Sequence, residues 1–278
     1  MLSEKLYLKS KLKMTPFNIF ISSSDTYADI WPVFFDLFEK FWPEFDGTIY
    51  LQTEDKEYQH NNLQIVCTKV GKHKYFGETL RAGLKKIPDD SFLFLMIDYM
   101  FMGKVNHKQI VEYYSFFQHH DADSLRLIAE HRGSSRNTQN LDILECLPPS
   151  PNSFFSYQTA FWVKKKLIEM VLPHETPWSS EWWGDKRAHI LPLKLYAIHK
   201  GVSKPILYDA RGCLHRGKWL SNAIEFCKEI NYPIDISQRG EYQNEYIKLS
   251  TRLKLSWMLK RDGIKGSYWD LIKKKYFR

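Results

Sequence analysis

The chain has 278 residues, of which 44% are hydrophobic and 15% aromatic, and it carries a formal net charge of +8. This length and composition predict a soluble globular protein with one domain and a C-terminal appendage. No stretch approaches the roughly 20 uninterrupted apolar residues of a bilayer-spanning helix, so the sequence excludes a helical membrane span.

The cysteines and the first five residues indicate the cellular compartment of the protein. The four cysteines lie far apart and form no CxxC pair, which argues against a zinc site or a disulfide framework. Residues 1 to 5 mix charges and no apolar core follows them, so we expect no secretory signal. Both observations predict a cytoplasmic protein.

The positive charge is concentrated near the C-terminus. Residues 248 to 278 hold ten basic side chains and two acidic ones, so their net charge equals that of the whole chain. Tryptophan and tyrosine lie among them, which suits peripheral contact with the anionic inner face of a membrane. A solvated basic helix packed on the domain is the alternative. Because the main body is neutral and has no recognisable nucleic-acid motif, we expect no nucleic-acid partner.

Strands and helices alternate from residue 17 onward. A strand is expected at 17 to 22, followed by a polar loop and by a helix whose aromatic residues repeat at helical spacing from 31 to 42. The next expected elements are strands at 48 to 51 and 63 to 67, a helix from 76 to 87, a helix from 110 to 117 and a strand at 125 to 128. This alternation predicts an α/β fold with a largely parallel central sheet flanked by helices.

An apolar run from 91 to 97 ends on one acid, Asp98. Such a run is typical of a central strand that is covered on both faces. Ligands of open α/β sheets bind at the carboxyl ends of the strands, so Asp98 is expected where a nucleotide phosphate or its metal would bind. An acid that merely caps a turn is the alternative.

A second group of polar residues follows a less regular stretch. Residues 131 to 151 predict a surface loop, 154 to 158 a strand, and 163 to 171 a helix. The segment from 174 to 185 then places three acids among three tryptophans. Indole faces stack on sugar rings, and a carboxylate against aromatic walls has its pKa raised toward that of a working base. A packed aromatic corner with helix-capping acids is the alternative.

A third group lies in a basic loop. Residues 206 to 208 predict a strand that leads into a loop from 209 to 219, where arginine, lysine and histidine surround two glycines, and a helix follows. Such a loop can bring cations to a diphosphate near a helix amino terminus. A basic loop that simply faces solvent is the alternative.

Four motifs in this order resemble the GT-A-fold glycosyltransferases, above all a group found in bacterial capsule and lipopolysaccharide gene clusters and in large DNA viruses. The motifs are the polar loop 22 to 25, Asp98-Tyr99, the Glu/Pro/Trp/Glu segment 175 to 181, and Arg-Gly-Lys-Trp at 216 to 219. The resemblance covers residues 16 to 235. It leaves an N-terminal extension at 1 to 15 and a basic, aromatic helical tail at 236 to 278.

The resemblance implies transfer of a sugar from a UDP, GDP or dTDP donor to a hydroxyl of a glycan or lipid-linked acceptor. It assigns donor binding to Ser22, Ser23, Asp25, Asp98, Tyr99, His215, Arg216 and Lys218. Trp178, Trp182 and Trp183 are expected to bind the acceptor. An inverting displacement needs a carboxylate base, for which Glu181 is the first candidate and Asp185 and Glu175 follow.

One departure from the family pattern concerns a metal. Such enzymes commonly carry two acids at the strand end, whereas Ile97 precedes Asp98 here and Tyr99 follows it. A divalent manganese or magnesium ion would therefore keep Asp98 as one protein ligand beside the donor phosphates. The loop that holds Arg216 and Lys218 could instead supply the missing positive charge.

Two other functions stay open. A sugar nucleotidyltransferase would be expected to have a glycine-rich, arginine-bearing loop after the first strand, but residues 22 to 25 contain no glycine. A catalytically inactive carbohydrate-binding or scaffold protein of the same fold is favoured by the thinned acid motif.

Overall fold

A computed structural model describes residues 15–128, 135–138, 142–146 and 155–243, together with residues 266, 267, 270 and 273. The predicted N-terminal extension lies outside these residues except for its last position. Most of the basic tail at 248 to 278 also lies outside them, so its predicted helix and membrane contact stay predictions. In the described part of the chain, no helix is long and apolar enough to cross a bilayer.

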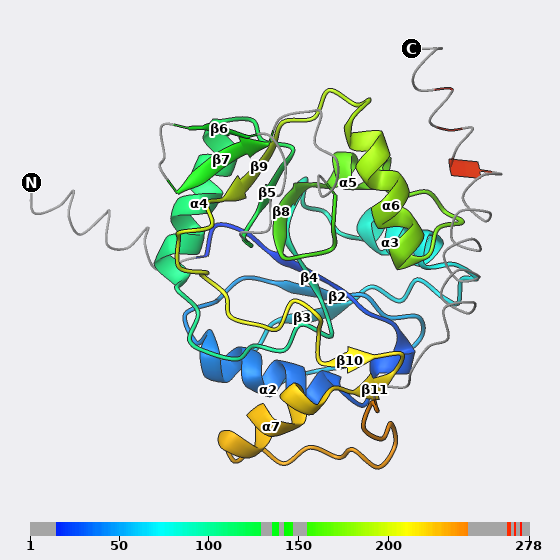
Figure 1. Cartoon of the computed structure of the whole chain (residues 1–278). Coiled ribbons are helices and arrows are strands. Elements are labelled where there is room, and N and C mark those ends of the chain that lie inside the picture. The colour runs from blue at the N-terminus through cyan, green and yellow to red at the C-terminus, as the bar shows by residue number, and fades with distance from the viewer. Residues whose placement is uncertain are drawn as a thin grey trace, which may run out of the picture.

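A nine-stranded sheet forms the centre of the molecule (Figure 1). In spatial order its strands are β3 (Ile65–Cys67), β2 (Ile49–Leu51), β1 (Ile19–Ser22), β4 (Ser91–Met96), β8 (Ala160–Val163), β5 (Ser124–Arg126), β9 (Leu195–Ile198), β7 (Ile143–Cys146) and β6 (Ser135–Asn137). The pairings give β7 and β8 the opposite direction to all the others. The sheet is therefore mixed but largely parallel, which confirms the predicted fold class.

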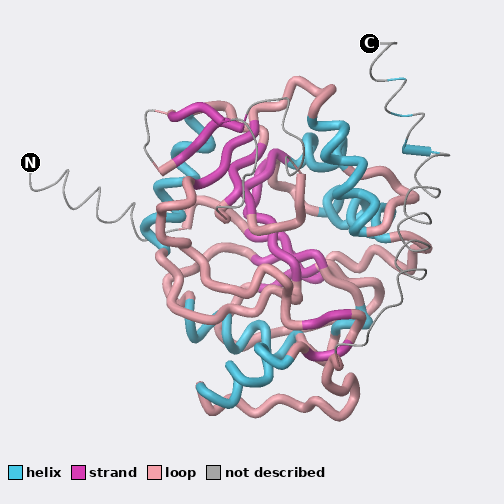
Figure 2. Tube along the Cα trace, in the orientation of Figure 1, coloured by secondary structure: helices cyan, strands magenta, loops and turns pink. Residues whose placement is uncertain are grey.

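Helices cover both faces of this sheet, as Figure 2 shows. They are α2 (Trp31–Phe41), α3 (Phe76–Lys86), α4 (His107–His119), α5 (Lys164–Met170), α6 (Pro177–Ala188) and α7 (Ser221–Glu229), with a short 3₁₀ turn η1 (Asp25–Tyr27). Side chains alternate across each strand, so Ile19 and Ile21 of β1 pack in one core with α2, α4 and α7. Phe20 faces the other core, where α3, α5 and α6 contribute.

The strand β4 lies in the middle of the sheet, as its apolar sequence predicts. It pairs with β1 on one side and with β8 on the other. Its residues from Phe92 to Leu95 are buried, with alternate side chains in the two cores. The strand ends at Met96, and the chain turns at Ile97 and Asp98.

Three local predictions in the second half were wrong. The expected surface loop at 131 to 151 contains β6 and β7. The expected strand at 154 to 158 is irregular over its described residues, and the strand β8 begins at Ala160. Residues 206 to 208 form no strand either, because Leu207 accepts a single backbone bond from Met102 and Ile206 packs into the core. Ile206 is buried in this core, whereas Leu207 is exposed.

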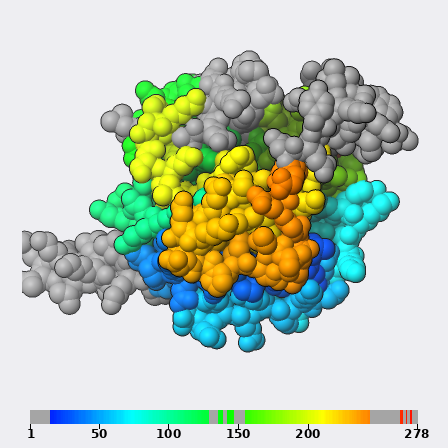
Figure 3. Space-filling view, turned by 60° about the horizontal axis from the view of Figure 1, so that its bottom comes forward, coloured from blue at the N-terminus to red at the C-terminus, as the bar shows by residue number. Residues whose placement is uncertain are grey.

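The basic loop is a small hairpin. β10 (Leu214–His215) pairs antiparallel with β11 (Lys218–Trp219). The two turn residues, Arg216 and Gly217, both have positive φ, of 51° and 79°, as a tight two-residue hairpin requires. In Figure 3 the yellow to orange segment that carries this hairpin and α7 covers the blue region of α2.

Candidate functional site

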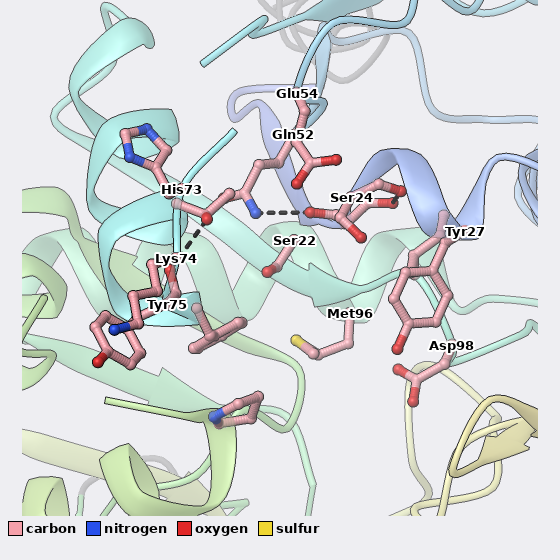
Figure 4. Close-up of a pocket in the computed structure, with 15 residues that line it drawn as sticks. Ser22, Ser24, Tyr27, Gln52, Glu54, His73, Lys74, Tyr75, Met96 and Asp98 are labelled. Atoms are coloured by element: carbon pink, nitrogen blue, oxygen red, sulfur yellow. Dashed lines mark hydrogen bonds between the residues drawn. The ribbon is translucent and has the colours of Figure 1, made fainter. Parts of the chain in front are cut away.

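A pocket of about 240 Å³ opens at the carboxyl edge of the parallel strands (Figure 4). Its lining comes from the ends of β1, β2 and β4, from the segment that enters α3, and from the first residue of α6. The lining residues are Ser22, Ser23, Ser24, Tyr27, Gln52, Glu54, His73, Lys74, Tyr75, Phe76, Thr79, Met96, Ile97, Asp98 and Pro177. This is the edge at which α/β sheets bind ligands.

Strand pairing places the predicted residues of β1 and β4 side by side. Ser22 lies opposite Met96 in the parallel register, so the serine loop and the acid that follows β4 share one wall. Gln52 follows β2, and its Nε2 donates to the Ser23 carbonyl at 2.7 Å. The sequence predicted the serine loop after β1 and the acid after β4 in this wall, but it did not predict Gln52.

Asp98 is the most unusual group in the pocket. Its side chain is largely enclosed, and its buried Oδ1 has no hydrogen-bond partner among the residues that the structure describes. Burial raises the pKa of this carboxyl to about 6. The Tyr27 ring points toward it in Figure 4, and burial followed by the charge of Asp98 raises the pKa of that phenol. An enclosed acceptor of this kind suits a cation or a ligand donor.

The third group of the sequence contacts Asp98 through its backbone. The N–H of Cys213 donates to the Asp98 carbonyl at 2.7 Å. Next to Asp98, Tyr99 stacks on Tyr208 with ring centroids 4.7 Å apart. Gln158 links the pair, since its Nε2 donates to the Tyr99 hydroxyl and its Oε1 accepts from the Tyr208 hydroxyl. The segment from 206 to 213 is therefore fixed against the end of β4.

The predicted cations of this segment lie on the hairpin, outside the pocket lining. His215, Arg216 and Lys218 are all exposed. Arg239 holds the hairpin against η1: its Nη1 donates to the Gly217 carbonyl and its Nη2 to the Thr26 carbonyl. Because Thr26 precedes Tyr27, the hairpin lies at the rim beside Tyr27, while the basic side chains in the lining are His73 and Lys74.

Helix α6 brings Glu181 to the same edge of the sheet. The helix begins with a Thr176 cap and with Pro177, which lines the pocket, and Glu181 follows one turn later. Glu181 Oε1 accepts the N–H of Tyr157 at 2.9 Å, just ahead of β8, the partner of β4. Burial raises the pKa of Glu181, against the lowering effect of that N–H. Glu181 itself is not among the described lining residues.

The carboxylate of Glu175 is buried and pairs with an arginine. It is 1% exposed, and its two oxygens accept from Arg187 Nη1 and Nη2 at 2.8 and 2.6 Å. Ser267 also donates to its Oε1 at 2.5 Å, so the pair anchors a residue of the C-terminal tail. Glu175 thus lies in a buried ion pair rather than in the pocket lining.

The other predicted residues are divided between surface and interior. Trp178 and Trp182 are exposed on α6, with Asp185 half-buried beyond them, whereas Trp183 is buried. The rings of Trp183 are therefore covered by the core. Asp25 accepts the backbone N–H groups of residues 54, 55 and 56, and against the effect of burial these bonds lower its pKa. Its carboxylate fixes the loop that follows β2.

Most of the pocket lining that the sequence did not predict follows β2, or lies just before α3 and in its first turn. These residues are Gln52, Glu54, His73, Lys74, Tyr75, Phe76 and Thr79. For Gln52 and Glu54 the available signal was a polar side chain just after a strand, which is also the position of Asp98. Across the described ranges, no three His, Cys, Asp or Glu side chains gather as a metal cluster.

No protein-family model matches this sequence, and no curated protein matches it. Among solved structures, the chain is similar to TarS of S. aureus, with a TM-score of 0.43 and 14% identity over 67% of this chain and 35% of TarS. It is similar to an apo UDP-glucose pyrophosphorylase, with a TM-score of 0.42 and 10% identity over 66% of this chain and 90% of that one. The chain is also similar to the galactosyltransferase LgtC in complex with donor and acceptor sugar analogs, with a TM-score of 0.36 and 12% identity over 88% of this chain and 93% of LgtC. The chain spans about a third of the length of TarS.

Proposed function

We propose that this chain is a glycosyltransferase that moves a sugar from a nucleotide donor to an acceptor hydroxyl. One observation carries the proposal: the pocket at the carboxyl edge of β1, β2 and β4 encloses the Asp98 carboxylate, whose Oδ1 finds no partner in the described part of the chain. A donor needs such a polar, partly enclosed site for its nucleotide. Ser22 and the backbone at the end of β1 are the proposed contacts of the nucleoside. The Ser23 hydroxyl already accepts from Trp31 Nε1, and the Ser24 hydroxyl bonds to Thr26.

The diphosphate of the donor carries negative charge that grows as the sugar leaves. A divalent manganese or magnesium ion would fit Asp98, because the buried Oδ1 has no hydrogen-bond partner in the described part of the chain and donor phosphates complete the ligands of such ions. When bound, that ion would neutralise the leaving diphosphate. The chain also has cations of its own that can stabilise the negative charge of the diphosphate. They are Lys74 in the pocket lining and the hairpin residues Arg216 and Lys218 at the rim.

The acceptor must lose a proton, and Glu181 is the group we assign to this step. Its carboxylate takes the proton from the acceptor hydroxyl while the acceptor oxygen bonds to the anomeric carbon. The bond from that carbon to the diphosphate breaks, and its electron pair leaves with the nucleoside diphosphate. The raised pKa of Glu181 favours its role as a base near neutral pH. An attack from the face opposite the leaving group inverts the anomeric carbon.

The process that we propose is synthesis of a surface polysaccharide or another glycan at the cytoplasmic side of a membrane. The basic residues at 248 to 278 are the proposed contact with that surface. Co-sedimentation with anionic vesicles should be lost when this segment is deleted, and binding that persists would refute the contact.

Incubation with a panel of nucleotide sugars, with and without manganese, tests the reaction class. Release of free nucleoside diphosphate from one donor, even slowly and without an acceptor, supports transfer. Release of pyrophosphate from a nucleoside triphosphate and a sugar phosphate would instead identify a nucleotidyltransferase. A panel that yields neither product would leave a binding or scaffold protein.

A further inference from the structure

Two tryptophan side chains are exposed on α6 beside the pocket. Trp178 is 67% exposed and Trp182 is 45% exposed, although a large indole is usually well buried. They lie four residues apart, so they share one face of the helix at a spacing of about 6 Å along its axis. Lys186 continues that face, with its ammonium 3.9 Å from the Trp182 ring centre. We call these three side chains the α6 aromatic face.

The α6 aromatic face begins one residue after a residue that lines the pocket. Pro177 lines the pocket, and Trp178 is the next residue. Glu181, the proposed base, lies between the two tryptophans in the sequence. A molecule whose reacting hydroxyl reaches Glu181 would therefore lie beside the two indoles.

The chemistry of this face fits a saccharide. Sugar rings place apolar C–H faces on aromatic rings, and their hydroxyls bond to charged groups such as Lys186 and Asp185. A protein interface would need roughly 800 Å² of continuous surface on each partner. In the described ranges the other exposed large hydrophobic side chains are Val66, Leu207 and Ile236, and none of them lies on α6. Two indoles among charged residues make a narrow strip rather than a broad apolar patch.

We infer that the acceptor is an oligosaccharide of at least two sugar units, an inference that rests on the proposed glycosyltransferase function. Two adjacent units stack on Trp178 and on Trp182, because the two rings follow one another along α6. One of these units presents its hydroxyl to Glu181, which lies between the two tryptophans along the helix axis. The spacing of the indoles is on the scale of one sugar ring.

Calorimetric titration of the full chain with linear oligosaccharides of one to six units tests this inference, with glucose, galactose and N-acetylglucosamine series. In at least one series we expect the affinity to rise from one unit to two and then to stay level. Trp178→Ala and Trp182→Ala should each weaken trisaccharide binding about tenfold. Trp178→Phe, which keeps a stacking ring, should restore part of the loss.

Val66→Ala is the matched control, because it removes an exposed apolar side chain from β3 and should leave trisaccharide binding unchanged. Affinity that does not depend on chain length, or tryptophan variants that bind like the native chain, would overturn the inference. So would binding to phosphatidylglycerol vesicles through the same tryptophans without any saccharide binding. Nucleotide titration of the native chain is run separately: nucleotide binding without saccharide binding refutes only this inference, whereas absent nucleotide binding refutes the proposed function.

Discussion

Gly212 and Asp98 are in direct contact, with no room for a side chain between them. A Cβ built on Gly212 would lie 2.7 Å from Asp98 Oδ2, and Gly212 has a φ of +82°. Both the contact and the backbone conformation therefore require glycine at this position. The loop after Tyr208 thus sets the position of the carboxylate that follows β4.

Gly212→Ala should displace the Asp98 carboxylate and weaken nucleotide binding. Gly240→Ala is the matched control, since Gly240 has a φ of +65° and, its two chain neighbours aside, no atom of the described residues lies within 4 Å of the position that a Cβ would take. Each substitution should cost about 1 kcal/mol of unfolding free energy through the left-handed backbone alone. Only Gly212→Ala should also lower nucleotide affinity in a calorimetric titration. Equal affinities in the two variants would contradict a role of Gly212 in positioning Asp98 for nucleotide binding.

The pKa of Asp98 predicts a pH dependence of stability in the absence of divalent ions. This pKa is about 6 in the folded chain and 3.8 ordinarily, so the folded chain holds the proton more tightly than the unfolded chain. The contribution of Asp98 to unfolding free energy should therefore fall as pH rises from about 4 to about 6, by on the order of 2 kcal/mol. Urea unfolding of the native chain and of Asp98→Asn measures it. A constant difference between the two across this range would contradict the assignment.

Glu181→Gln tests the proposed base. The amide oxygen of glutamine can still accept the N–H of Tyr157, so the fold should be kept. Turnover should fall by roughly 10² to 10⁴ because the variant cannot take the acceptor proton. Steady-state kinetics and donor titration check this together. If donor affinity falls as far as turnover does, Glu181 is a binding or structural residue.

Glu175→Gln should act on stability instead. It leaves Arg187 with an uncompensated buried charge, so unfolding free energy should drop by about 3 to 5 kcal/mol. Glu145→Gln breaks the more exposed pair with Arg136 and should cost no more than about 1 kcal/mol. Denaturant unfolding of both variants gives the comparison. A hundredfold loss of turnover in folded Glu175→Gln would make this residue a catalytic candidate again.

The first half of the fold was predictable because its elements follow local patterns. The run before Asp98 is apolar on both faces, and α2 repeats its aromatic residues at helical spacing, so each pattern has one structural solution. The strands β6 and β7 lack such a pattern: Ser135–Asn137 is exposed and polar throughout. The strand β6 forms by pairing with β7, and no pattern in its own residues predicts that pairing.

The candidate site was predictable only where side chains follow strongly apolar strands. Ser22, Ser23 and Asp98 line the pocket. The burial of Glu175 depends on its ion pair with Arg187, twelve residues away. The residues next to Glu175 in the sequence do not distinguish a carboxylate in such a pair from a catalytic one. The placement of Trp183 inside and Trp178 outside likewise follows from how α6 rotates against its neighbours, which composition does not reveal.

The central claim is that the pocket around Asp98 binds a nucleotide sugar. Calorimetric titration of the native chain and of Asp98→Asn with UDP, GDP and dTDP sugars in the presence of manganese tests it most directly. We predict that one donor binds the native chain with a Kd between about 1 μM and 1 mM, and at least tenfold more weakly after the substitution. Absence of binding for every donor, or equal affinity in the two proteins, would contradict the claim.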